Sequence, residues 1–439
     1  MNKTFYLETY GCQMNMADSE LITGMLLREG YQPTRQLEEA DAIFVNTCAI
    51  REHAEEKVHS RLGRFHRVKK QRPQVIIGVL GCMAQHLKST ILESKPYVDI
   101  ILGPDSYRRL PQLLRRETVD LTSQVDTTLS RFEVYDDLFP SRAEGINAWV
   151  SIMRGCDKFC TFCIVPFTRG RERSRSVESI LEEIQQAVDQ GFVEITLLGQ
   201  NVNSYSHEGA RFPHLLAAVA RLPGVQRIRF TSPHPQDVDD SLLTVMASHE
   251  NICNSIHLPL QAGSDRILRR MNRSYTKEHF LQLAHKIRKQ LPGIGISTDI
   301  IVGFPGETER DFQDTLDVME TIRFDSAFTF KYSPRVGTKA AEYLEQLSEE
   351  EKQTRLEEVI TRQKKHTLER NREYVGRVEW VLVEKESKRS RDQWAGRTDS
   401  NKWVIFDKST AQIKELVPVM ITAARGVTLH GKLVKKESN

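Results

Sequence analysis

Short apolar runs alternate with helical patterns between about residues 147 and 370, and this alternation constrains the fold most strongly. The predicted strands of this region cover residues 148–153, 194–199, 227–231, 255–259, 294–303 and 327–332. Repeated strand–helix units form parallel sheets, and this number of units is typical of a partial TIM-like barrel. We therefore expect a β/α barrel whose active-site residues follow the carboxyl ends of the strands.

The loop after the first of these strands carries three cysteines, Cys156, Cys160 and Cys163, in a Cys-x3-Cys-x2-Cys pattern. Three soft thiolates at this spacing are typical of an iron–sulfur cluster, and three ligands leave one iron of a [4Fe–4S] cluster open to a small molecule. A zinc knuckle is the alternative, but zinc sites close with a fourth ligand at compact spacing, and the next histidine is His207. The pattern therefore predicts a [4Fe–4S] cluster.

Three other cysteines end the first three predicted strands of the chain: Cys12, Cys48 and Cys82. Helical patterns separate these strands, which indicates a doubly wound parallel sheet with ligands at the carboxyl ends of its strands. A single cysteine in such a place is often only a small buried apolar side chain. The repeated placement favours a second cluster with three protein ligands. Cys253 has no cysteine near it in the sequence and is expected to pack inside.

The chain of 439 residues is long enough for two or three domains. We expect an α/β domain over residues 1–118, a barrel over residues 147–370 and a small β domain over residues 371–439. Residues 119–146 are rich in Thr, Ser and Asp, have little periodicity, and predict a linker.

The last domain is predicted to be a small β-barrel because its strands are short and separated by glycine turns. Basic and aromatic side chains are mixed in it, which suits contact with an RNA backbone and stacking on bases, although an ordinary barrel with a basic surface is the alternative. The candidate RNA-binding residues are Lys388, Arg389, Arg391, Trp394, Arg397, Lys402 and Trp403.

Bulk charge does not indicate a nucleic-acid partner, because 62 Lys and Arg nearly balance 59 Asp and Glu. The chain has no apolar run long enough to span a membrane and no secretory signal at its start. Its seven cysteines, an odd number, fit a reducing compartment better than a disulfide framework. We expect a cytoplasmic protein with no membrane contact.

Several phrases resemble the radical S-adenosylmethionine (SAM) methylthiotransferases. Tyr-Gly-Cys-Gln-Met-Asn at 10–15, Asn-Thr-Cys-Ala-Ile-Arg at 46–51 and Gly-Cys-Met-Ala-Gln at 81–85 occur in order upstream of the Cys-x3-Cys-x2-Cys loop. Gly-Arg-Thr-Asp-Ser at 396–400 looks like part of a TRAM domain, a module of tRNA-modifying enzymes. The resemblance implies two [4Fe–4S] clusters, one that cleaves SAM and an auxiliary one that handles sulfur.

The same resemblance assigns the loops at the strand ends to SAM. The family often has Gly-Gly-Glu after its second strand, where this chain has Gln200 and Asn201. The remaining candidates for SAM contacts are Arg229, Ser232, Gln261 and Asp299.

The phrases around Cys12 and Cys48 are most similar to family members that act on tRNA. The resemblance implies conversion of N6-(dimethylallyl)adenosine next to the anticodon to its 2-methylthio derivative, with one SAM as methyl donor and another as source of a 5′-deoxyadenosyl radical. It also implies an external electron donor and sulfur source, and we expect a monomer. Two alternatives within the family are methylthiolation of a ribosomal-protein aspartate or of threonylcarbamoyl-adenosine in tRNA. A non-enzymatic iron–sulfur regulator that binds RNA is an alternative of another class.

Overall fold

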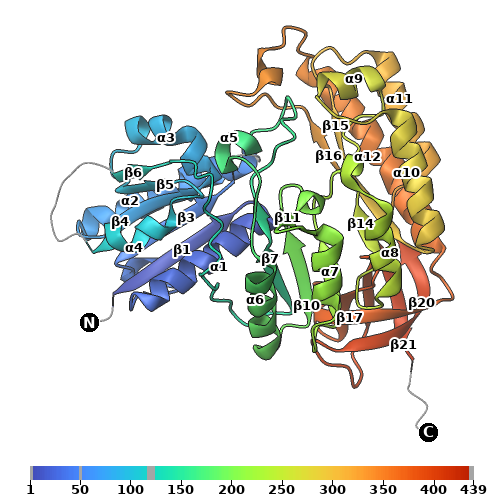
Figure 1. Cartoon of the computed structure of the whole chain (residues 1–439), viewed down its shortest axis with the longest axis horizontal. Helices are drawn as coiled ribbons and strands as arrows, with labels where there is room; N and C mark the ends of the chain where they lie inside the picture. Colours follow the sequence, from blue (N-terminus) through green and yellow to red (C-terminus); the bar gives the residue numbers. More distant parts are fainter. Residues whose placement is uncertain (1–2, 49–51, 116–123, 435–439) are drawn as a thin grey trace.

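A parallel sheet forms the first unit of the structure, with its strands in the order β2-β1-β3-β4-β5-β6 (Figure 1). The computed structural model describes residues 3–48, 52–115 and 124–434. The strands are β1 (Thr4–Tyr10), β2 (Gln32–Pro33), β3 (Ala42–Thr47), β4 (Ile76–Gly81), β5 (Ile100–Leu102) and β6 (Gln124–Asp126). All neighbouring pairs are parallel, so the carboxyl ends of the strands lie along one edge.

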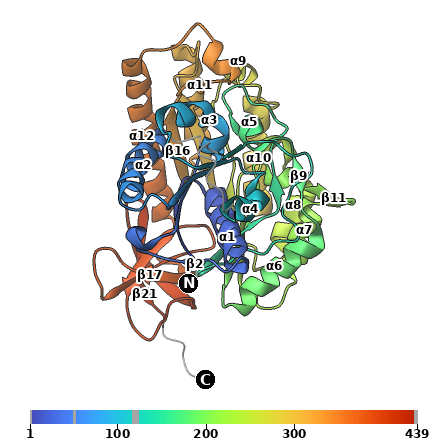
Figure 2. The same ribbon diagram turned by 90° about the vertical axis from the view of Figure 1, so that its left-hand side faces the viewer.

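Helices cover both faces of this sheet, as predicted for a doubly wound domain (Figure 2). They are α1 (Gln13–Arg28), α2 (Glu52–Gln71), α3 (Cys82–Ser94) and α4 (Leu110–Leu114). In β3, Ile43 and Val45 belong to the core on the α2 side, whereas Phe44 belongs to the core on the α1 side. Successive side chains of a strand point to opposite faces of the sheet. All residues of β3 are buried, as expected for a strand that is covered by helices on both faces.

The segment predicted as a linker is bound to both of the units that it joins. Residues 124–126 form the edge strand β6, and Tyr135 is buried. Arg142 is also buried, between Glu20 of α1 and Glu183 of the central unit. The segment therefore fastens the first unit to the second in addition to connecting them.

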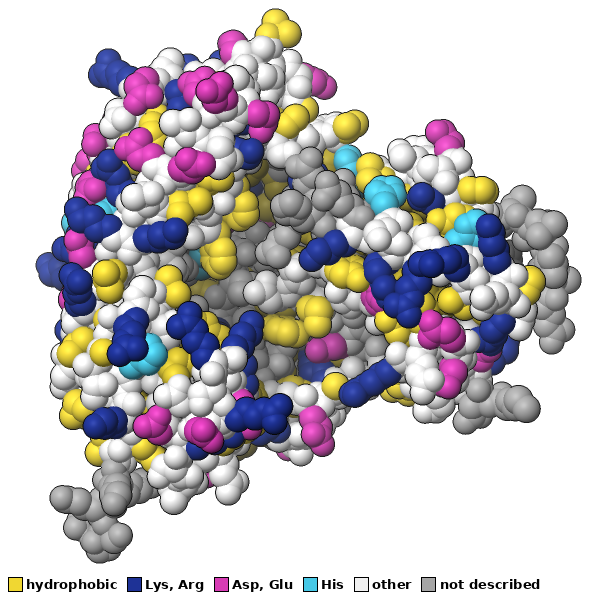
Figure 3. All heavy atoms as spheres, turned by 180° about the vertical axis from the view of Figure 1, so that it is seen from behind, with side chains coloured by type: hydrophobic (Ala, Val, Ile, Leu, Met, Phe, Trp, Pro, Cys, Tyr) yellow, Lys and Arg dark blue, Asp and Glu magenta, His cyan; other side chains and the backbone are white. Residues whose placement is uncertain are grey.

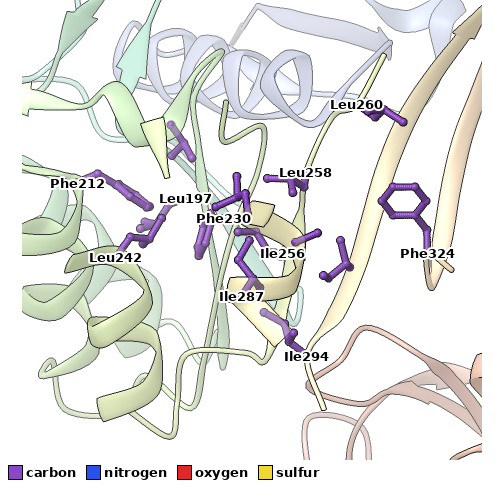
Figure 4. Close-up of a cluster of buried hydrophobic side chains, with 14 of the residues drawn as sticks. Leu197, Phe212, Phe230, Leu242, Ile256, Leu258, Leu260, Ile287, Ile294 and Phe324 are labelled. Carbon is purple, nitrogen blue, oxygen red and sulfur yellow. The ribbon is translucent and has the colours of Figure 1, made fainter. Parts of the chain in front are cut away.

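Parallel strands of the central unit form a partial barrel, which confirms the predicted fold class. Two sheets, β13-β10-β7 and β14-β15-β16, are joined by a parallel bridge between Ile228 and Ile252. The strands are β7 (Asn147–Ser151), β10 (Glu194–Leu198), β13 (Arg227–Phe230), β14 (Ser255–His257), β15 (Gly295–Val302) and β16 (Ser326–Lys331). Side chains from these strands and from the surrounding helices meet in one apolar core, part of which is seen in Figure 4.

The helices around the barrel begin at residues that cap their free backbone N–H groups. Ser176, Thr276 and Thr308 each accept a hydrogen bond from the backbone of the first turn that follows. The main helices are α6 (Val177–Asp189), α7 (Phe212–Ala220), α8 (Asp240–Ser248), α10 (Lys277–Gln290) and α11 (Glu309–Ile322). Short elements that the sequence did not predict are α5 (Val165–Arg169), α9 (Asp265–Arg270), β8 (Met153–Arg154), β9 (Arg173–Ser174), β11 (Ser206–His207) and β12 (Ala210–Arg211).

The long helix α12 (Glu349–Arg372) runs from the barrel to the last unit. One side of it is buried, and Arg355 of this side pairs with the buried carboxylate of Glu307 at 2.6 Å. Its sequence, rich in charge, suggests a solvated connecting helix, and that expectation is wrong for this face. Within the described ranges, no helix combines the length and the apolar composition that crossing a membrane requires.

A closed β-barrel with the strand order β17-β18-β19-β21-β20 forms the last unit, as predicted. Its strands are β17 (Val378–Glu386), β18 (Gln393–Arg397), β19 (Trp403–Asp407), β20 (Leu416–Arg425) and β21 (Thr428–Leu433). This unit packs on the end of the central barrel at which the strands begin. A Cβ on Gly295, the first residue of β15, would lie 2.4 Å from the carbonyl oxygen of Ser400. The carboxyl ends of the central strands therefore face away from the last unit.

Candidate functional site

The loop of Cys156, Cys160 and Cys163 follows the short strand β8 and is held by backbone geometry at its start. Gly155 has a φ of +81°, and a Cβ there would lie 2.0 Å from the carbonyl oxygen of Arg171. Its N–H donates a hydrogen bond of 2.6 Å to Oε1 of Gln200. The sequence candidate Gln200 therefore contacts the cysteine loop directly.

A segment more than one hundred residues further along the chain holds the other side of this loop. Phe159 has a φ of +46°, and its carbonyl oxygen accepts a hydrogen bond of 3.0 Å from Nδ2 of Asn272. Arg273 Nη1 donates to the Sγ of Cys160 at 3.4 Å. Sequence reasoning missed both Asn272 and Arg273, because nothing in their local pattern indicates a contact across this distance in sequence.

Burial shapes the ionisation of the cysteines in the loop. It raises the pKa of Cys156 to about 11 and that of Cys163 to about 12, so both are neutral thiols at neutral pH without a metal. Metal ligands of this kind bind as thiolates, so loading the site must release protons. The Arg273 guanidinium provides positive charge beside the sulfur of Cys160, the remaining cysteine of the loop.

The structure places Cys12, Cys48 and Cys82 at the carboxyl ends of the adjacent strands β1, β3 and β4. A hydrogen bond with Cys48 lowers the pKa of the Cys12 thiol, so these two side chains are in contact. Gly11 allows the close approach, since a Cβ there would lie 2.6 Å from the Cβ of Cys48. Cys12 immediately precedes α1, and Cys82 is the first residue of α3. The N–H groups at helix N-termini favour thiolates, as metal ligation requires.

The two cysteine groups face one interface between the first and the central units. Cys82 packs against Ile164, which directly follows Cys163. Cys12 packs with Leu198 at the end of β10. The ligand roles of these six cysteines remain predictions, but the structure brings each group to one place and the groups toward each other.

The cysteine side chains are not arranged around a single ion. Among the residues that the structure describes, no three His, Cys, Asp or Glu side chains converge as mononuclear metal ligands.

Other strand-end residues predicted for SAM lie near the loops at the carboxyl ends. Ser232 and Gln261 have φ values of +57° and +68°, a strained backbone that is concentrated at functional sites in proteins. Asp299 Oδ2 lies 3.2 Å from Nε2 of His257. Asn201 is buried, and its Nδ2 donates to Asp237 at 3.0 Å.

The expectation that Arg229 lies beside these loops is wrong. Its guanidinium reaches back toward the start of the strands, where Nε pairs with Glu194 at 2.8 Å and Nη2 donates to the carbonyl oxygen of Thr398 at 2.9 Å. A long side chain in the middle of a short strand can extend toward either end, and the buried Glu194 carboxylate attracts this one.

Two of the candidate RNA-binding residues are occupied inside the molecule, which corrects their assignment. Arg397 pairs with Glu194 at 2.9 Å, and Lys402 is buried and pairs with Asp325 at 2.7 Å. Both belong to the contact between the last unit and the barrel. The other candidates are exposed or half-buried: Lys388, Arg389, Arg391, Trp394 and Trp403.

Cys253 is buried at the start of the strands, away from both cysteine groups, as expected from its isolated position in the sequence. Burial raises the pKa of its thiol to about 11, which makes it a neutral packing residue.

Comparison with known protein families divides the chain into the same three parts as the structure does. Residues 4–103 match the uncharacterized protein family UPF0004, residues 150–319 match the radical SAM superfamily, and residues 372–434 match the TRAM domain. In fold, the chain is similar to the radical S-adenosylmethionine methyltransferase TsrM from Kitasatospora setae, with a TM-score of 0.58 and 13% identity over 78% of this chain and 77% of that one. The fold and the cysteine loop thus define a radical SAM protein, a class that implies one [4Fe–4S] cluster and SAM.

Relatives that match the chain over its full length show which family of radical SAM proteins it belongs to. The proteins named tRNA-2-methylthio-N(6)-dimethylallyladenosine synthase from Bacteroides fragilis and Porphyromonas gingivalis are 49% and 48% identical to this chain. The alignments cover 99% of this chain and 96% and 95% of those proteins. The chain belongs to the tRNA-2-methylthio-N(6)-dimethylallyladenosine synthase family of methylthiotransferases.

Proposed function

We propose that this chain converts N6-(dimethylallyl)adenosine next to the tRNA anticodon to its 2-methylthio derivative, with SAM as methyl donor and as radical source. The observation that carries the proposal is the meeting of the two cysteine groups at one interface, where Cys82 touches Ile164 beside Cys163. A centre that activates the C2–H bond and a centre that supplies sulfur must both reach the same adenine, so they must lie close together. The names of the full-length relatives support the same reaction.

Each cysteine group fits a cluster with three protein ligands. Cys156, Cys160 and Cys163 would hold the cluster that binds SAM, and the auxiliary cluster would be held by Cys12, Cys48 and Cys82. When bound, these groups supply one-electron cleavage of SAM and a sulfur atom for transfer. The chain holds the first group in place through Gln200 and Asn272, and Arg273 offsets the negative charge on Cys160. Gln200, Asn201, Ser232, Gln261 and Asp299 are the polar groups that we propose for SAM.

Two exposed aromatic rings on β16 provide an apolar surface for the dimethylallyl group. Phe328 and Phe330 are 59% and 45% exposed, whereas Ala327 beside them packs against the core. Since side chains of a strand alternate, both rings face the side of β16 opposite to that core, and Phe328 meets the ring of His257 edge-on at 5.8 Å. His257 in turn pairs with Asp299, so the apolar surface adjoins the polar groups proposed for SAM.

The RNA would lie across the face seen in Figure 3. That face is hollowed between the first unit and the rest of the molecule, and Lys and Arg side chains lie on both sides of the hollow. Exposed Lys388, Arg389 and Arg391 between β17 and β18 would contact phosphates, and Trp394 and Trp403 offer half-buried rings. The target adenosine must leave its stack to reach the barrel.

The reaction needs an electron donor and a sulfur source that this chain does not contain. We infer that both are external, and that the enzyme works as a monomer in the cytoplasm, where tRNA is modified and thiols stay reduced.

Incubation of the reconstituted enzyme with SAM, dithionite and sulfide, and with tRNA that carries the prenylated adenosine, tests the proposal. We expect 5′-deoxyadenosine to form and the tRNA nucleoside to gain the mass of a methylthio group. Unchanged prenylated tRNA would overturn this substrate, and a modified ribosomal protein or threonylcarbamoyl-adenosine would identify the alternative one. Absence of 5′-deoxyadenosine would favour the non-enzymatic regulator.

Cysteine variants separate the two proposed roles. Replacing Cys156, Cys160 and Cys163 by Ala should abolish SAM cleavage. Replacing the other group by Ala should preserve cleavage, leave about four irons per chain and stop methylthiolation. Cys253→Ala is the matched control and should keep both clusters.

A further inference from the structure

Three buried ionic side chains lie between the two cysteine groups. Asp18 of α1 accepts from Nη2 of Arg154 at 2.6 Å and from Nη2 of Arg169 at 2.8 Å. The side chain of Asp18 is 0% exposed and the two arginine side chains are 4% exposed. Arg154 lies two residues before Cys156, and Arg169 ends the short helix α5 that packs on α3. The group therefore joins the first unit to the loop of the central unit.

The charges of this group do not cancel. Two guanidinium groups and one carboxylate leave a net charge of plus one in a place without solvent. A buried charge without a counter-charge is strongly destabilising, so an anion is expected next to it. The neighbouring Arg173 does not change the balance, because it has its own partner in Asp105 at 2.7 Å.

Arg169 directs its remaining hydrogen-bonding capacity at the auxiliary cysteines. Its Nη1 is buried and has no hydrogen-bond partner among the described residues. Helix α5, which ends at Arg169, packs on α3, the helix that Cys82 begins, and Cys82 itself packs against Ile164 at the start of α5.

We propose that Arg169 is a positioning residue for the auxiliary cluster, whose net negative charge balances the excess positive charge of the Asp18–Arg154–Arg169 group. A [4Fe–4S] core with three thiolate ligands carries one negative charge in its oxidised form, which matches the excess of plus one. The free Nη1–H of Arg169 is then a donor to sulfur at Cys82. This inference rests on the proposed function, since it requires the second cluster.

A positive charge held beside a cluster stabilises its reduced form, so the reduction potential reports the role of Arg169 without any measurement of turnover. The background for the test is the full chain with Cys156, Cys160 and Cys163 replaced by Ala, in which only the auxiliary cluster forms. Anaerobic potentiometric titration followed by electron paramagnetic resonance gives the midpoint potential, and iron analysis gives the occupancy.

Arg169→Gln should lower the equilibrium constant for reduction about tenfold, a shift of about 59 mV to more negative potential for a one-electron couple. Asp18→Asn should shift the potential in the opposite direction, and Arg169→Lys should restore most of the wild-type value. Opposite shifts are not expected from mere damage to packing. Arg171→Gln is the matched control, because its side chain is 62% exposed and solvent screens its charge.

An unchanged potential in Arg169→Gln with about four irons bound would overturn the role of Arg169 and leave the proposed function intact. A background protein that binds no iron would overturn the auxiliary cluster and this inference together. If Arg169→Gln alone fails to bind iron, the inference stands only if Asp18→Asn gives the positive shift, and it is overturned if that shift is absent.

Discussion

Replacing the buried His234 by Asn is expected to flatten the dependence of stability on pH. His234 lies in the loop after β13, is 6% exposed, and accepts a hydrogen bond of 3.3 Å at Nδ1 from the backbone of Gln236. Burial, together with the positive charges of Arg273 and Lys158, lowers the pKa of its imidazole to about 2. The folded protein thus keeps this ring neutral at pH values at which the unfolded chain, with a histidine pKa of about 6.5, binds a proton.

The sign and size of the effect follow from this difference. Because the unfolded state binds the extra proton, the free energy of unfolding falls as the pH drops below about 6.5, by about 1.4 kcal/mol per pH unit. Between pH 7 and pH 5 the contribution of His234 is a loss of about 2 kcal/mol. Asn retains an acceptor but does not titrate, so His234→Asn should lack this part of the loss.

Urea denaturation of the metal-free protein at both pH values measures the difference between wild type and variant. His279→Asn serves as the matched control, because His279 is exposed on α10 and its replacement should leave the wild-type pH dependence. If His234→Asn loses as much stability as wild type between the two pH values, the reasoning from burial is refuted.

Three further changes test other parts of the structure. Glu194→Gln leaves the buried guanidinium of Arg229 without a carboxylate and takes from Arg397 one of its two carboxylate partners, the other being Glu384. It should weaken the contact of the last unit by about 3 kcal/mol; limited proteolysis of residues 371–434 measures this, and wild-type protection would contradict it. Gly81→Ala should lower the stability by about 2 kcal/mol, because the φ of Gly81 is +92° and the added Cβ would lie 2.3 Å from Asn46 Oδ1. Gly63→Ala, at an exposed position of α2, should instead raise the stability by about 0.5–1 kcal/mol. Thermal unfolding compares the two variants, and melting temperatures that shift in the same direction would be evidence against this account. Phe328→Ala should lower kcat/KM for prenylated tRNA about tenfold or more, because the apolar contact with the dimethylallyl group is lost, and SAM binding should be unchanged. A kcat/KM equal to that of the wild type would show that the ring is not part of the prenyl site.

Local periodicity was sufficient to predict most strands and helices of the fold. The apolar runs that end in Cys12, Cys48 and Cys82 predicted a parallel sheet, and the structure places these cysteines on adjacent strands. Strand β18 was missed because Gln393–Arg397 shows no clear apolar alternation.

Contacts between residues far apart in the chain were beyond sequence reasoning. The hydrogen bond from Arg273 to Cys160 joins positions 113 residues apart, and that from Arg229 to Thr398 joins positions 169 apart. The resemblance assigned Arg229 to SAM, and that assignment is wrong because its guanidinium pairs with the Glu194 carboxylate of this chain. Only the tertiary arrangement decides which anion a long basic side chain reaches.

The last unit cannot be exchanged freely for a similar barrel from another protein. Arg227, whose side chain is 2% exposed, donates to the carbonyl oxygens of Arg397 at 2.6 Å and Trp380 at 2.8 Å, and Arg397 itself enters the central unit to meet Glu194. A chimaera would need a donor barrel that presents both carbonyl groups and a basic side chain at the same positions. Grafting a new RNA-binding specificity onto this enzyme is therefore better done in the β17–β18 loop, where Lys388 and Arg389 are exposed and the contact with the central barrel is left intact.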